Sequence, residues 1–214
     1  MPSDTPFSHL LTTRDQLRAH FPEPSPLVLK KVIGQLDAHA RALLALTPYV
    51  VLATADAQGR CDSSPRGGEP GFIQVLDDRH LFLPEVTGNR RNDSLLNLLE
   101  NPGIGLLVLV PGFRETLRIN GQAWVTRDPQ LLERSAHGGK LPLLGIGIRV
   151  DECYLHCAKA ALRGALWNPQ SWPAREQLPD AAEILRDHTR GEEGDGSVKH
   201  MQQMLHESYT QRLY

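Results

Sequence analysis

The 214-residue sequence has few cysteines, little net charge and no long apolar run. Its three cysteines lie at irregular spacings, which favours reduced thiols and predicts a cytoplasmic location. A formal net charge of −2 gives no electrostatic basis for binding nucleic acid or a membrane surface. The longest apolar run, residues 103–110, is too short to span a membrane, and the N-terminus lacks the pattern of a secretory signal. We therefore expect a soluble globular protein without nucleic-acid or membrane partners.

Several catalytic motifs are also absent. The sequence has no G-x-S-x-G, no H-E-x-x-H and no Walker-type loop. The stretch "CYLHC" offers Cys153, His156 and Cys157 as metal ligands, but residues 153 and 157 share one face of a strand while 156 points to the other. Because no second ligand pair exists, buried thiols beside an edge histidine are favoured over a metal site.

The two ends of the chain have the character of helical additions to one domain. Residues 1–25 are rich in Pro, Thr and Asp and predict a loose arm. Residues 26–47 follow a Ser-Pro helix start and repeat apolar residues at the helical period, so we expect one helix there. Residues 158–214 predict a helical tail with a polar, Gly-rich break at 190–197.

The middle of the chain, residues 48–157, has the pattern of short strands joined mostly by tight turns. A short helix after Asn92 or Asp93 and a smaller one at Asp128-Pro129 interrupt it. The six or seven expected strands are residues 49–55, 61–66, 71–76, 80–85, 103–110, 116–126 and 143–157. This order predicts a mainly β (α+β) fold, an antiparallel barrel or sandwich.

Arginines gather near one predicted helix start. Arg90 and Arg91 directly precede it in "TGNRRNDS", where unpaired backbone N–H groups attract anions. The guanidinium group matches phosphate oxygens two at a time. We therefore interpret Asn89, the arginine pair and the N–H groups near Asp93 and Ser94 as a phosphate cradle, with solvated loop charges as the open alternative.

A second unusual stretch is "PRGGEPGF", which places three glycines beside Arg66. A flat aromatic ligand needs backbone that it can approach without side chains, and Gly67, Gly68 and Gly71 supply it. A wide hairpin or bulge with positive φ is the alternative explanation for the glycines. Trp167 and Trp172 either stack on a ligand or close the core.

Four stretches in order resemble the pyridoxamine 5′-phosphate oxidase-like, FMN-binding split-barrel family, in its branch of small flavoproteins. The resemblance covers residues 26–173. It implies a six-stranded antiparallel split β-barrel with N- and C-terminal helices, and a homodimer that holds two FMN molecules at its interface. The stretches are "LATADAQGRCDSSPRGGEPGF", "LFLPEVTGNRRNDSLLNLLENP", "GLLVLVPGFRETLRINGQAWVT" and "YLHCAKAALRGALWNP".

The resemblance also implies a set of FMN-binding residues. Arg66, Arg90 and Arg91 match the family's phosphate-binding cations, Asn89 stands where the family has a hydroxyl, and Thr116 is the polar residue two before Arg118. The ring is expected along residues 64–74 and against Leu83 and Pro84, with Arg163 and Trp167 coming from the other subunit. The full set is Ser64, Arg66, Gly67, Gln74, Leu83, Pro84, Asn89, Arg90, Arg91, Ser94, Thr116, Arg118, Arg163 and Trp167.

The resulting functional hypothesis is an FMN-dependent oxidoreductase that transfers hydride to or from an unknown small substrate. No residue stands out as a catalytic base. The tryptophan- and arginine-rich C-terminal signature of true pyridoxamine phosphate oxidases is missing, which argues against vitamin B6 oxidation. Because related folds bind FMN, F420 or haem, a non-catalytic carrier of one of these remains an alternative. A structural dimer with an empty cleft is another.

Overall fold

The computed structural model describes residues 6–86, 88 and 90–212, and its contacts divide the chain into two units between Val32 and Ile33. The first unit holds α1 (Arg14–His20) and α2 (Pro26–Lys30). Thr13 and Gln16 form a reciprocal cap at the start of α1. Neither helix buries a residue. The described part of the arm expected over residues 1–25 therefore contains one helix, α1, and no buried side chain in that helix.

The single helix expected over residues 26–47 is wrong. The helix that begins at Pro26, α2, ends at Lys30, and a second helix, α3 (Ala38–Leu46), begins after a break. In the break the backbone of Ile33 pairs with Cys153 of the last strand. Asp37 then caps α3, because its Oδ1 accepts a hydrogen bond of 2.8 Å from the N–H of Ala40. The apolar period continues through the break, but tertiary backbone pairing replaces the helix there.

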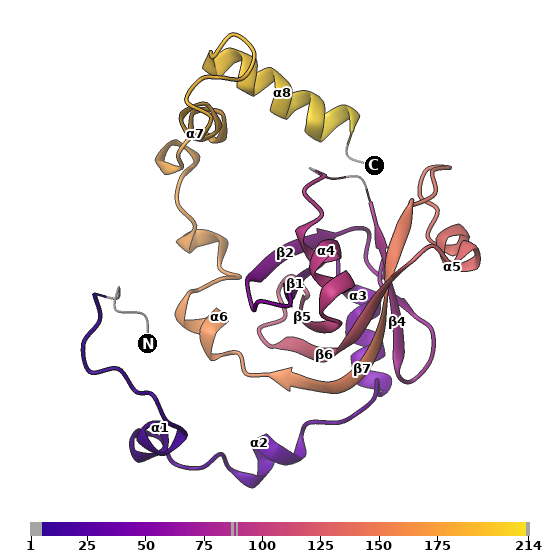
Figure 1. Ribbon diagram of the computed structural model, residues 1–214, viewed down its shortest axis with the longest axis vertical. Helices are drawn as coiled ribbons and strands as arrows, with labels where there is room; N and C mark the ends of the chain where they lie inside the picture. The colour runs from indigo at the N-terminus through magenta and orange to yellow at the C-terminus, as the bar shows by residue number, and fades with distance from the viewer. Residues whose placement is uncertain (1–5, 87, 89, 213–214) are drawn as a thin grey trace. The chain divides into compact units, whose positions relative to one another are not determined.

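The centre of the chain is a seven-stranded antiparallel sheet with the strand order β2-β1-β5-β6-β7-β4-β3 (Figure 1). This confirms the α+β, antiparallel split-barrel fold. The strand beyond the expected six is β3, which has only two residues. The bounds are β1 Tyr49–Ala55, β2 Cys61–Gly67, β3 Gln74–Val75, β4 His80–Glu85, β5 Gly103–Leu109, β6 Thr116–Thr126 and β7 Leu144–His156.

Alternate residues of the strands form the core, as a sheet with one covered face requires. Leu52, Leu106, Ile119 and Ile148 are among those almost completely buried. The sheet also curls, because β2 and β4 lie near opposite ends of the strand order and yet are joined by an ion pair. The curl brings the ends of these two strands together.

Two helices lie between strands along the chain, and further helices follow the last strand. The helix α4 (Asp93–Glu100) packs against β1, β2 and β6, and α5 (Pro129–Arg134) follows β6 (Figure 1). After the sheet come α6 (Lys159–Arg163), two short 3₁₀ turns, α7 (Ala181–His188) and α8 (Val198–Gln211), which agree with the expected helical tail. The helices α7 and α8 contact each other. Among the residues described, no helix is both long and apolar enough to cross a membrane.

Candidate functional site

One face of β2 carries a row of polar side chains. Asp62, Ser64 and Arg66 are half-buried, while the residues between them are exposed. The Nε of Arg66 donates to Glu85 Oε2 of β4 at 2.9 Å, and the two side chains are only 13% and 18% exposed. The Nη1 of Arg66 donates to Ser64 Oγ at 2.8 Å and to the carbonyl of Pro65 at 2.9 Å. Its Nη2 has no hydrogen-bond partner within the described part of the chain.

The start of α4 lies beside this row. Ser94 is buried, and its Oγ donates to Asp62 Oδ2 at 2.5 Å. Arg91 Nε lies 2.7 Å from Asp93 Oδ2, and this hydrogen bond, with the nearby charge of Asp62, raises the pKa of Arg91. Arg90 is exposed and has no hydrogen bond or ion pair to any described residue. The predicted arginine pair therefore contains one paired and one unpaired cation.

The backbone at the start of α4 is unusual. Arg90 has φ 63° and Asn92 has φ 58°, both in the left-handed region that costs non-glycine residues energy. Asn92 occupies the N-cap position, but its side chain makes no capping hydrogen bond, so the predicted cap is not formed. The third member of the predicted cradle, Asn89, lies outside the described residues.

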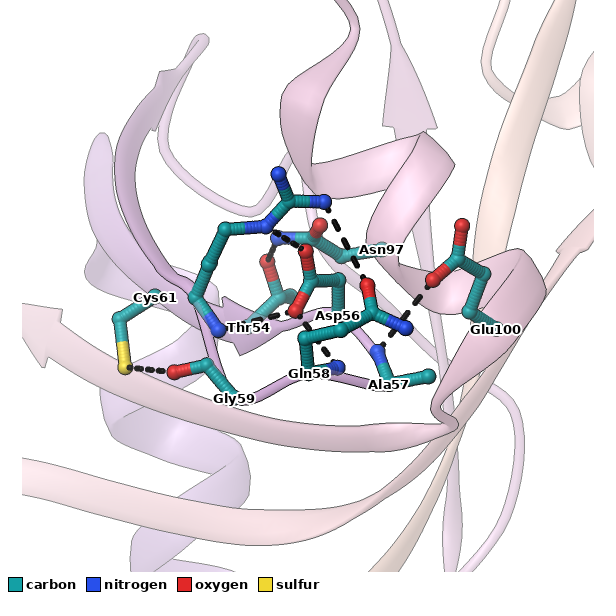
Figure 2. A network of polar contacts seen from close by, with 9 residues as sticks. Thr54, Asp56, Ala57, Gln58, Gly59, Cys61, Asn97 and Glu100 are labelled. Carbon is teal, nitrogen blue, oxygen red and sulfur yellow. Dashed lines mark hydrogen bonds and ion pairs between the residues drawn. The ribbon is translucent and has the colours of Figure 1, made fainter.

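A polar face holds α4 against the β1–β2 hairpin. Asn97 Nδ2 donates to Thr54 Oγ1 at 3.0 Å, and the N–H of Ala57 donates to Glu100 Oε2 at 3.3 Å (Figure 2). With Ser94, these residues recur every three positions and so lie along one side of the helix. The three contacts fix the start of α4 relative to β2.

The turn between β1 and β2 is itself fixed by Asp56, which is almost fully buried (Figure 2). Its Oδ1 accepts hydrogen bonds of 2.9 Å from the backbone N–H groups of Gln58 and Arg60, and its Oδ2 accepts one from Arg60 Nε. The backbone hydrogen bond from Arg60 contributes most to holding the pKa of Asp56 below its ordinary value.

A pocket of about 210 Å³ adjoins the ends of β2 and β4. It lies between the glycine-rich segment and the end of α5. Gln74 of β3 contributes an amide whose Nε2 donates to the carbonyl of Leu131 at 3.2 Å and to Ser135 Oγ. Its Oε1 is buried and has no partner among the described residues. The lining residues are Gly67, Gly68, Glu69, Pro70, Gly71, Phe72, Gln74, Pro84, Val86, Arg134, Ser135, Ala136 and His137.

The chain itself accounts for two of the three glycines of this segment. A Cβ on Gly68 would lie 2.8 Å from the Cβ of Phe72, and one on Gly67 would lie 3.4 Å from the carbonyl of Pro48. Gly71 has φ +88° and faces the carbonyl of Ala45. Positive φ, the alternative explanation, therefore applies to Gly71, and the close contact with Phe72 explains Gly68. Neither explains Gly67, where a Cβ would meet only an ordinary contact distance.

Leu83 and Pro84, both predicted to contact a ring, lie in different surroundings. Leu83 is fully buried in the hydrophobic core. Its side chain therefore packs into the core of the sheet, and its contact with a ring stays a prediction. Pro84 is half-buried and lines the pocket.

The remaining predicted residues lie elsewhere. Arg118 is exposed on β6, with its guanidinium 5.8 Å from the ring centre of Tyr154, and Thr116 pairs through its backbone with His156. Trp167 Nε1 donates to the carbonyl of Phe113 at 2.9 Å. Arg163 is exposed at the end of α6. Contributions from a second subunit stay a prediction for Arg163 and Trp167.

The structure adds residues that the sequence reasoning missed, chiefly Glu85, Asp62 and Ser135. One signal was available for Glu85. Leu81 and Leu83 face the core, so Glu85 continues the same face of β4 and needs a partner there. The partner itself, Arg66, is 19 residues away and could not be read from a local pattern.

Three comparisons place the chain among known proteins. No curated protein matches it. Solved structures that it resembles include HupZ of Group A Streptococcus (17% identity, 56% of this chain and 92% of that chain, TM-score 0.46). They also include an FMN-binding protein of Syntrophomonas wolfei (15%, 54% and 82%, 0.40) and HutZ, the heme storage protein of Vibrio cholerae (17%, 56% and 93%, 0.41).

The family model for pyridoxamine 5′-phosphate oxidase matches residues 36–157. The matched region begins just before α3 and ends just after β7, so it contains the whole sheet, α4 and both parts of the candidate site. The chain therefore belongs to the pyridoxamine 5′-phosphate oxidase family.

Proposed function

We propose that this protein binds FMN and uses it as an oxidoreductase acting on a small substrate. The phosphate is assigned to the start of α4, and the isoalloxazine ring to the segment Gly67–Gln74 with Pro84. Membership of the family supports a flavin in general. The choice of FMN rests on the residues at these two places.

The observation that carries the proposal is the start of α4. Here backbone N–H groups lack a side-chain cap, and Arg90 has no partner among the described residues. Anions bind at such helix starts because the N–H groups and the helix dipole both favour negative charge. Arg91 and the Nη2 of Arg66 can add charge-assisted hydrogen bonds nearby. Two left-handed residues in three positions are a strain that ligand sites often contain.

The pocket suits the other end of the cofactor. The buried Oε1 of Gln74 needs a hydrogen-bond donor, and an unsatisfied buried acceptor is costly. The N–H group of an isoalloxazine ring is such a donor. The backbone of Gly67 and Gly68 and the ring of Pro84 provide the flat surroundings that a planar ligand needs.

When bound, FMN supplies the hydride acceptor and donor, and the residues of the chain supply position and electrostatics. The arginines hold the phosphate end, and the amide of Gln74 orients the ring edge. Hydride transfer to a flavin requires no strong base, so the proposal assigns no acid–base role to the residues that line the pocket. Vitamin B6 oxidation is not part of the proposal.

The proposal includes a homodimer, which would let Arg163 and Trp167 reach the cofactor of the partner subunit. One surface suited to such an interface is the outer side of the sheet. Tyr49 and Leu107, on adjacent strands there, are 43% and 38% exposed, and Arg118 and Tyr154 continue the same face. Large apolar side chains on an open sheet face are typical of protein–protein contacts.

A visible absorption spectrum of the purified protein tests the proposal. We expect flavin bands that bleach with NADH, NADPH or dithionite and return in air. Flavin bands that never bleach with a nicotinamide would favour a non-catalytic flavin carrier, and a Soret band would favour haem. A colourless protein that gains no flavin absorbance on addition of FMN would contradict the proposal.

A further inference from the structure

We propose that Glu85 is a positioning residue, which fixes Arg66 so that one end of its guanidinium group is free for a bound flavin. This inference rests on the proposed function and assigns a role to a residue outside the predicted set. Glu85 ends β4 and Arg66 lies in β2, so the pair joins strands near opposite ends of the sheet.

The hydrogen bonds of Arg66 occupy two of its three nitrogens. Nε donates to Glu85, and Nη1 donates to Ser64 Oγ and to the carbonyl of Pro65. Nη2 has no partner within the described part of the chain. A guanidinium held in this way can donate to a ligand without first ordering its long side chain. Glu85 therefore contributes to ligand binding through Arg66, without contact with the ligand.

A competing interpretation makes the opposite prediction. A carboxylate beside an anion site repels the anion and competes with it for the arginine. Geometry favours positioning, because Glu85 accepts its hydrogen bond from Nε alone and Nη2 has no partner among the residues that the structure describes. The surroundings also favour it, since both side chains are less than one-fifth exposed and are shielded from water.

Two substitutions separate these interpretations without removing the side chain. Glu85→Gln keeps a hydrogen-bond acceptor and removes the charge. Glu85→Asp keeps the charge and withdraws it by one methylene. Positioning predicts that E85Q binds FMN within about threefold of the wild type and that E85D binds about tenfold more weakly, because residues in one network couple at this scale. Competition predicts tighter binding by E85Q and little change for E85D.

The closing experiment is a fluorescence titration of the full chain with FMN and with riboflavin, for wild type, E85Q, E85D, R66A and R66A/E85D. If Glu85 acts through Arg66, the double variant binds FMN as R66A does. Additional weakening in the double variant would show an effect through the fold and would overturn the inference. Riboflavin, which lacks the phosphate, shows which end of the cofactor Arg66 contacts.

A matched control is Asp78→Ala, which breaks the ion pair of Asp78 with Arg41, another contact between distant segments. It should leave the affinity for FMN unchanged. Equal FMN binding by wild type, E85Q and E85D would overturn the role of Glu85 and leave the proposed function standing. A wild-type chain that binds neither FMN nor riboflavin would overturn both.

Discussion

Neighbouring residues at the ends of β2 and β4 face two different environments. We call the charges on β2, at the end of β4 and at the start of α4 the charged cluster. It comprises the ion pairs Arg66–Glu85 and Arg91–Asp93, Asp62 and the exposed Arg90. Gly67 and Pro84, one position away, line the pocket to which Gln74 also contributes, and the Oε1 of Gln74 is buried without a partner among the described residues. Most charges of the cluster are in ion pairs, whereas beside the pocket one buried acceptor, Gln74 Oε1, lacks a donor among the described residues.

This difference indicates how the charged cluster and the pocket would each select a ligand. The formal charges of the cluster cancel, so general attraction to anions is weak and selection depends on the few unpaired donors. The pocket selects by shape and by a donor for Gln74. A ligand with an anionic end and a planar end that carries an N–H group satisfies both.

The largest effect should come from Leu83, a predicted ring contact whose side chain lies in the core. Leu83→Ala should lower the free energy of unfolding by about 2–5 kcal/mol, because it leaves a cavity among buried side chains. Chemical denaturation measures this loss. Flavin affinity of the folded fraction should stay at the wild-type value, and a selective loss of flavin binding with normal stability would return Leu83 to the site.

The roles of the arginines can be separated by comparing Arg66, which is paired with Glu85, with Arg90, which has no partner among the described residues. Arg66→Ala and Arg90→Ala should each weaken FMN binding by about 1.5–3 kcal/mol, the range for hydrogen bonds to charged groups. Only Arg66→Ala should also destabilise the fold, by roughly 1–3 kcal/mol, because Glu85 loses its partner. FMN titration and thermal unfolding of both variants test this, and neither substitution should disturb the proposed homodimer. If both variants bind FMN as tightly as the wild type does, the assignment of the phosphate to these arginines is incorrect.

The pocket is tested by Gln74→Leu, which removes the unpaired oxygen. Binding of FMN and of riboflavin should weaken equally, by about 0.5–1.5 kcal/mol, because a neutral hydrogen bond to the ring is lost. Side-by-side titrations with the two flavins measure this. If only FMN binding changes, Gln74 acts at the phosphate end and the division between the two environments is incorrect.

The smallest effect concerns the turn between β1 and β2, which contacts α4. Asp56 has a lowered pKa in the folded chain, so its contribution to stability is complete above the ordinary aspartate pKa of about 4 and is lost as pH falls through the folded value. Asp56→Asn should be less stable at neutral pH and should show a smaller loss of stability on acidification. Unfolding curves from neutral to acidic pH measure the difference, and parallel pH profiles would contradict it.

Local patterns predicted the strands well and the contacts between distant residues poorly. The ranges 49–55, 80–85 and 116–126 agree with β1, β4 and β6, because apolar strands between turn residues are locally encoded. The helix over 26–47 failed because Ile33 pairs with a strand more than a hundred residues away.

The site shows the same limit. The sequence placed Arg90 and Arg91 beside a helix start, and the structure agrees. It could not show that Glu85 binds Arg66 or that Phe72 packs on Gly68, since both depend on how the sheet curls. Nor could it show which side of β4 Leu83 faces, since Leu81, Phe82 and Leu83 are all buried and the strand has no alternating pattern of exposure.

The most direct test of the central claim is the ratio of the wild-type dissociation constants for riboflavin and FMN. An arginine cluster that holds the phosphate should make FMN bind at least about tenfold more tightly, since a single charge-assisted hydrogen bond contributes that much. Equal constants for the two flavins would show that these arginines do not recognise the phosphate.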